Sequence, residues 1–274
     1  MLGGIVVFLI LQKIDSFTPS VFVFFANIIL EVLVLIFLGK FKIDVFAKVR
    51  KVKLNFWLIG LLVCIVGLFS NAFTVFLLFT LHFPWTQQAE PLGPNFLYTS
   101  SIGGVHVAWL LDLWVLAPII EEFLHRKYMY GLFVRKSVPM ASVLTALFFM
   151  VGHPIDTWRS LCWIIDFFLF ALQANYLYAQ TGRIIFPILM HISANCGVQL
   201  IRPWFISNDL TVFQRHLLLG IGVFVFFILL IWLNVYLKMK IGDIKITREK
   251  TDQSFNWYCY ALFGLFFFLS WLWI

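Results

Sequence analysis

Ionisable or amide side chains interrupt three long apolar stretches of this 274-residue chain. The stretches contain Glu121 and Glu122 in APIIEEFLHR, His153 in FMVGH, and His191 and Asn195 in HISAN. Such groups are costly inside a membrane, so each is a candidate for function. A carboxylate can activate a water molecule as a general base, and imidazole and amide groups can donate hydrogen bonds to an oxyanion. This inventory is sufficient for direct hydrolysis of an amide bond.

Spacing suggests different roles for the two adjacent carboxylates. Residues four apart share a helix face, so Glu122 can pair with Arg126 as a structural brace. Glu121 points about 100° away from Glu122 and can face the bundle interior as a general base or acid. His125 also lies four residues after Glu121 and could pair with it instead. The spacing leaves both arrangements of Glu121 open.

The two other motifs can complete a hydrolytic site. His191 and Asn195 are four residues apart, so the imidazole and the amide share one helix face and can both donate to an oxyanion. His153 can orient and polarise a water molecule together with Glu121. We therefore predict Glu121, His153, His191 and Asn195 as catalytic residues.

The composition of the chain requires lipid as the solvent for much of its surface. Hydrophobic residues make up 62% of the chain and charged residues only 12%, about half the share of a soluble domain. The net charge of +7 does not indicate nucleic-acid binding, because the basic residues lie in short connectors between apolar runs. The four cysteines form no CxxC pair and are expected to be free thiols in apolar surroundings.

The apolar runs predict an all-α fold, a polytopic transmembrane bundle of about eight spans. A span needs about 20 apolar residues. The eight segments are Val21–Leu38, Leu54–Leu81, Val105–Val134, Val138–His153, Leu161–Gln180, Ile184–Ile201, Leu217–Leu237 and Trp257–Ile274. A ninth segment, Leu2–Leu11, is short for a span. We expect one integral membrane domain over 1–274, with a catalytic core at 104–201.

Connector charges predict the orientation of these spans. Lys and Arg are concentrated in the connectors 40–53, 126–136 and 238–250, whereas the long connector His82–Ser100 contains none. The positive-inside bias assigns the basic connectors to the cytoplasm. We therefore expect a multi-pass protein of the cell membrane, bacterial from its composition, with a site reached from the cytoplasmic side.

Helix rise predicts that the three motifs lie at similar depths. Counted from the cytoplasmic end of its own span, Glu121 lies roughly 21 Å deep and His153 roughly 24 Å. His191 and Asn195 lie roughly 12 and 18 Å deep. Unrelated structural residues have no reason to agree in depth. The agreement favours one shared site.

The motifs together resemble those of a known family. They are EExxxR (Glu121, Glu122, Arg126), FxxxH (Phe149, His153) and HxxxN (His191, Asn195). In this order and on separate helices, they resemble the CPBP family of intramembrane glutamic endopeptidases, which includes CAAX prenyl endopeptidases, abortive-infection proteins and bacteriocin-processing enzymes. The resemblance covers about residues 117–195.

The resemblance implies a role for each motif. It implies that Glu121 and His153 activate the water and that His191 and Asn195 form the oxyanion hole. The remaining motif residues, Glu122, Arg126 and Phe149, would support the site. His125, a further candidate supporting residue, stands where the family often has an apolar or aromatic residue, so the resemblance leaves its pairing open.

The sequence lacks the motifs of other classes of membrane protease. The sequence contains no HExxH and no His or Cys pair at metal spacing, so we expect a peptidase without metal or other cofactor. It contains no GxSxG serine and no GxGD aspartate.

The expected partners are a peptide or membrane-protein substrate and the lipid bilayer, with a role in peptide maturation, signalling or bacteriocin self-immunity. The alternative is a non-catalytic scaffold, regulator or transporter that uses the same polar cluster.

Overall fold

The computed structural model describes residues 55–80, 112–134, 137–151, 153, 160–207 and 211–241, together with Ile29 and Ile36. All the elements in these residues are helices, which agrees with the predicted all-α class. The helices are α3 (Phe56–Thr80), the π-helix η2 (Asp112–Leu116), α5 (Ala117–Glu122), the π-helix η3 (Phe123–Tyr130), α6 (Gly131–Phe133), α7 (Val138–Val151), α8 (Ser160–Thr181), α9 (Ile185–Ser207) and α10 (Val212–Ile241).

These helices coincide with six of the eight predicted spans. The first span apart from Ile29 and Ile36, the last span, the short segment Leu2–Leu11 and the connector His82–Ser100 lie outside the described residues. Among the described helices, α10 alone is long and apolar enough to cross a membrane by length and composition. The apolar parts of α3, α7 and α9 are shorter. The count of eight spans therefore stays a prediction.

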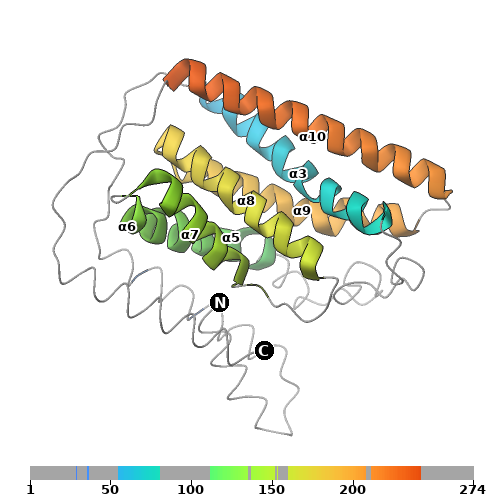
Figure 1. Ribbon diagram of the computed structural model, residues 1–274, viewed down its shortest axis with the longest axis horizontal. Coiled ribbons are helices and arrows are strands. Elements are labelled where there is room, and N and C mark those ends of the chain that lie inside the picture. The colour runs from blue at the N-terminus through green and yellow to red at the C-terminus, as the bar shows by residue number, and fades with distance from the viewer. Residues whose placement is uncertain are drawn as a thin grey trace, which may run out of the picture.

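The helices lie in three groups across the molecule. Figure 1 shows α10 and α3 along one side, α8 and α9 in the middle, and α5, α6 and α7 on the opposite side. The main helix contacts join α3 to α9 and α10, and α7 to α8. Gly182 has a φ of 63°, a conformation that glycine adopts without strain, and it ends α8 just before α9 begins.

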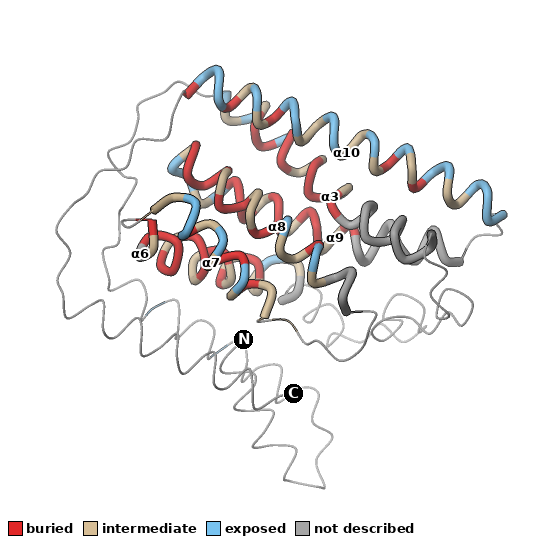
Figure 2. The backbone as a smooth tube through the Cα atoms, in the orientation of Figure 1, coloured by how far each residue is buried: buried red, intermediate tan, exposed pale blue. Residues whose placement is uncertain are grey.

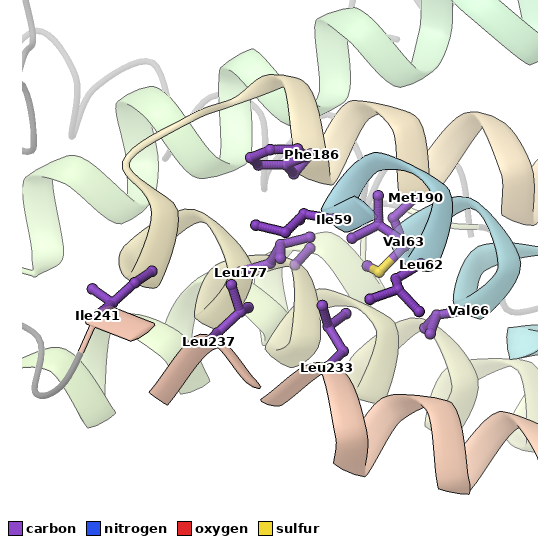
Figure 3. Packing of buried hydrophobic residues seen from close by; sticks show 11 residues of the cluster. Ile59, Leu62, Val63, Val66, Leu177, Phe186, Met190, Leu233, Leu237 and Ile241 are labelled. Atoms are coloured by element: carbon purple, nitrogen blue, oxygen red, sulfur yellow. The ribbon is translucent and has the colours of Figure 1, made fainter. Parts of the chain in front are cut away.

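A hydrophobic core joins α3, α8, α9 and α10. On α3 its members recur every three or four residues, which places them on one face of the helix. Figure 3 shows ten of these side chains meeting between the four helices: Ile59, Leu62, Val63, Val66, Leu177, Phe186, Met190, Leu233, Leu237 and Ile241. This core connects α9, which carries the HxxxN motif, to the two helices on the outer side of the molecule.

The outer face of α10 is apolar and exposed. Figure 2 shows exposed and intermediate residues along most of this helix. Only 17% of its apolar 18-residue stretch is buried. The exposed large side chains are Val212, Phe213, Leu217, Leu218, Ile221, Phe224, Phe227, Ile228, Ile231, Trp232, Val235 and Met239. A face of this size and composition suits contact with lipid.

Two amide side chains connect α10 to α8. Gln173 Nε2 donates to Asn234 Oδ1 at 3.0 Å, and Asn234 Nδ2 donates to Gln173 Oε1 at 3.3 Å. Replacing Asn234 by Leu removes both bonds and leaves the Gln173 amide unpaired. We expect the free energy of unfolding in detergent to fall by about 0.6–2 kcal/mol, the range for such bonds in membrane helices.

The control for this variant is Ile231→Leu, at an exposed position of the same helix, which should leave stability unchanged. A double-mutant cycle with Gln173→Leu measures the coupling between the two amides. A coupling energy of zero would show that the pair does not hold α10 in place.

Candidate active site

The EExxxR motif lies at a junction between two kinds of helix. Glu121 and Glu122 are the last residues of α5, and Phe123 begins the π-helix η3. On the other side of α5, Pro118 follows the π-helix η2. Proline has no N–H to donate to the preceding turn, and membrane helices accommodate it by local 3₁₀ or π adjustment. π-Helical turns are frequent at functional sites, and here they flank the two carboxylates.

Glu122 is held by two partners inside the protein. Arg126 Nε lies 2.9 Å from Glu122 Oε2, and both side chains are completely buried. The other carboxylate oxygen, Oε1, accepts a hydrogen bond from His191 Nδ1 at 2.8 Å. The spacing of the motif predicted the contact with Arg126. The bond to His191, on a helix 69 residues away, could not be found from spacing.

Aromatic rings cover the guanidinium of Arg126. Its Cζ lies 4.6 Å from the ring centroid of Phe149 and 5.9 Å from that of Phe170. Nη1 and Nη2 are buried and have no hydrogen-bond partner among the described residues. Contact with the faces of the two aromatic rings stabilises the guanidinium electrostatically in place of hydrogen bonds from Nη1 and Nη2. The charge of Arg126 is therefore balanced by Glu122 and enclosed by Phe149 and Phe170.

Glu121 differs from its neighbour because no Lys or Arg of the described residues forms an ion pair with it. Its Oε2 lies 3.8 Å from His191 Nε2, and its side chain retains 15% exposure. This oxygen has no hydrogen-bond partner in the part of the chain that the structure describes. The His191 ring thus lies between two carboxylates, with Glu122 at Nδ1 and Glu121 beyond Nε2.

The structure decides the open question about His125. Its Nδ1 lies 2.9 Å from the backbone oxygen of Glu121, and a carbonyl only accepts, so Nδ1–H is the donor. The contact is therefore with the backbone of Glu121 and not with its carboxylate. His125 is buried, and its ring meets the ring of Phe149 edge-on at 5.2 Å. It supports the junction without competing for the carboxylate.

His153 is oriented in a similar way at the end of the second motif. Its Nδ1 donates to the backbone oxygen of Phe149 at 2.8 Å, so a neutral His153 has Nε2 as its acceptor nitrogen. The ring also stacks on Phe167, with centroids 4.0 Å apart. The backbone bond and the ring contact together orient His153 so that Nε2 is the nitrogen left to accept a hydrogen bond.

Phe149 is the point at which the three motifs meet. Its ring centroid lies 5.2 Å from that of His125, 4.9 Å from His153 and 5.7 Å from His191. The structure therefore brings residues from all three motifs around one buried ring. Asn195 lies on α9 one turn beyond His191 and is half-buried, and its role at the oxyanion stays a prediction.

The cluster contains histidine and carboxylate side chains, which are common metal ligands. Within the described ranges, no three His, Cys, Asp or Glu side chains are grouped as metal ligands would be. The expected independence from metal stays a prediction, since it concerns the reaction and not the arrangement alone.

Comparison with known proteins finds a family model that matches the helical core carrying the three motifs. The family model that matches residues 103–197 is described as type II CAAX prenyl endopeptidase Rce1-like. The match covers about a third of the chain and includes all three motifs. It confirms the family that the motifs predicted.

A curated relative matches over part of both chains. An Escherichia coli protein described as "Uncharacterized 24.3 kDa protein" is 28% identical over 109 residues, which are 39% of this chain and 49% of that protein. The chain thus spans about half the length of the curated relative that it matches. No solved structure matches the chain significantly.

Proposed function

We propose that this protein is an intramembrane peptidase of the glutamic type, which hydrolyses a peptide bond with water activated by Glu121 and His153. The observation that carries the proposal is the position of His191 between two carboxylates of unequal surroundings. Glu122 is fully buried and paired with Arg126, whereas Glu121 is partly exposed and pairs with no Lys or Arg in the part of the chain that the structure describes. A carboxylate in an ion pair with Arg suits a structural role, and a carboxylate without such a pair suits proton transfer.

The proposed reaction begins with a water molecule between Glu121 and His153. Glu121 accepts a proton from this water, and the acceptor nitrogen of His153 helps to orient it. The water oxygen then bonds to the carbonyl carbon of the scissile peptide, and the carbonyl oxygen becomes an oxyanion. When the C–N bond breaks, the proton held by Glu121 passes to the leaving nitrogen. The products are a carboxylic acid and an amine, and the enzyme is returned unchanged.

His191 and Asn195 are proposed to stabilise the oxyanion. The bond from Nδ1 to Glu122 fixes the His191 ring with Nε2 toward Glu121. When Nε2 carries a proton it can donate to the oxyanion, as can the Asn195 amide one helical turn further along α9. Removing one donor of this kind costs about 10²–10³-fold in rate.

The proposed substrate is a peptide or a segment of a membrane protein within the bilayer. The proposed location is the bacterial plasma membrane, with the site reached from the cytoplasmic side. Peptide maturation, signalling and bacteriocin self-immunity are the roles that fit such an activity. Neither a metal nor another cofactor is included in the proposed mechanism.

A comparison of released peptides tests the proposal. Cells expressing the wild type, Glu121→Gln or His153→Ala are compared after membrane levels and melting temperatures in detergent have been matched. We expect at least one cleavage product to disappear in both variants, and its ends identify the cut bond. Identical peptide profiles for the three proteins, with a wild-type phenotype retained, would favour a scaffold or transport function.

A further inference from the structure

Helix α3 lies outside the region that matches the protease family, yet it touches the helix that carries His191 and Asn195. A Cβ added to Gly67 of α3 would lie 2.3 Å from the backbone oxygen of Met190 and 2.9 Å from Ser193 Cβ. Side chains do not approach other atoms this closely, because repulsion rises steeply below the van der Waals distance. The backbones of α3 and α9 are therefore in direct contact at Gly67.

A second glycine makes the matching contact from α9. A Cβ added to Gly197 would lie 2.6 Å from the backbone oxygen of Leu68, the residue after Gly67. Small residues at such crossings let membrane helices approach closely. On α3 itself, the Ser70 hydroxyl donates to the Gly67 carbonyl at 2.7 Å, so this hydroxyl is satisfied within its own helix.

The contact lies on the opposite face of α9 from the site. Met190, Ser193 and Gly197 are three and four residues apart, so they share one face. His191 and Asn195 point more than about 100° away from that face, given the rotation of 100° per residue. On their side, Glu122 binds His191. The helix is thus held by α3 behind it and by Glu122 in front.

We propose that the close contacts of Gly67 with Met190 and of Gly197 with Leu68 are a positioning device that sets the distance of His191 and Asn195 from Glu121. The inference rests on the proposed function. A backbone contact cannot be shortened, and any side chain at position 67 must push the two helices apart. A Cβ at 2.3 Å requires a shift of about 1 Å to reach an ordinary contact, and a misplacement of this size can cost about 10²-fold in rate.

The test compares two Gly→Ala variants of the same helix. Gly67→Ala introduces the clash, whereas a Cβ at Gly60 would meet only Leu189 Cδ1, at an ordinary 3.9 Å. On the substrate cut by the wild type, we expect Gly67→Ala to lower kcat about 10²-fold with KM unchanged. Gly60→Ala should remain within about twofold of the wild type, because its added methyl has room. Equal kcat values for folded Gly67→Ala and the wild type would overturn the inference, as would equal losses in both variants.

A second readout requires no substrate and separates this inference from the proposed function. The Nδ1–H proton of His191 that binds Glu122 can be followed by NMR in detergent micelles. We expect Gly67→Ala to shift this signal and Gly60→Ala to leave it in place, even if Glu121→Gln changes no peptide profile. An unshifted signal in Gly67→Ala would contradict the inference. If neither Gly67→Ala nor Gly197→Ala folds, the contact maintains the whole fold rather than the site, and the inference is also wrong.

Discussion

Glu121→Gln is expected to lower kcat by about 10³-fold or more, since positioned general bases contribute about 10²–10⁴-fold. The glutamine amide keeps the size of the side chain but cannot accept the proton of the attacking water. The fold should be unaffected, because Glu121 Oε2 has no hydrogen-bond partner in the described part of the chain. The measurement is single-substrate kinetics of purified protein in detergent, on the segment identified from the released peptides.

The control for Glu121→Gln is the melting temperature of the same preparation. A change of less than about 2 °C, which corresponds to about 1 kcal/mol or less for a chain of this size, would assign the rate loss to chemistry. A folded Glu121→Gln protein with more than a tenth of the wild-type kcat would be inconsistent with Glu121 as the base. Glu121→Asp, which keeps the carboxylate but moves it back by one methylene, should retain more activity than Glu121→Gln.

Glu122→Leu is expected to have the largest effect on stability. It removes the carboxylate that pairs with the fully buried Arg126 and accepts the bond from His191. Breaking a buried ion pair from one side costs about 3–5 kcal/mol, because the remaining charge has no compensation. We expect a loss of this size in the free energy of unfolding, measured by denaturant titration in detergent.

The double variant Glu122→Leu/Arg126→Leu separates the ion pair from the packing. Replacing both charges by apolar side chains is often neutral or stabilising, so the double variant should recover most of the lost stability. Its kcat should stay low, because the His191 ring has lost the acceptor that orients it. Lys127→Leu, at a half-buried neighbour that lies over the Phe123 ring, should change stability by less than about 1 kcal/mol. A Glu122→Leu protein as stable as Lys127→Leu would contradict the proposed brace.

The sequence predicted most helices well because apolar length and flanking charges carry the information. The predicted span Val138–His153 corresponds to α7, whose bounds are Val138–Val151. The predicted span Leu161–Gln180 corresponds to α8, whose bounds are Ser160–Thr181. The span Val105–Val134 was predicted as one helix, but its described part is divided by π-helical turns. Pro118 was the available signal, although a proline predicts a local adjustment without specifying which kind.

Contacts along one helix could be predicted for the site, and contacts between helices could not. The Glu122–Arg126 pair follows from a spacing of four residues. The bond between Glu122 and His191 depends on how α5 and α9 cross, which is decided by packing between helices distant in the sequence and not by spacing along either helix. Helix rise could place the three motifs at similar depths but could not show that Phe149 lies between their histidines.

The central claim, that Glu121 activates water and does not attack the substrate itself, is tested most directly by a single turnover in water labelled with ¹⁸O. With enzyme in excess over substrate, the new carboxylate of the product should carry one ¹⁸O atom and Glu121 none. The account would be contradicted if the first turnover gave unlabelled product and the label appeared in the Glu121 carboxylate, because the oxygen would then have come from the enzyme through a covalent intermediate.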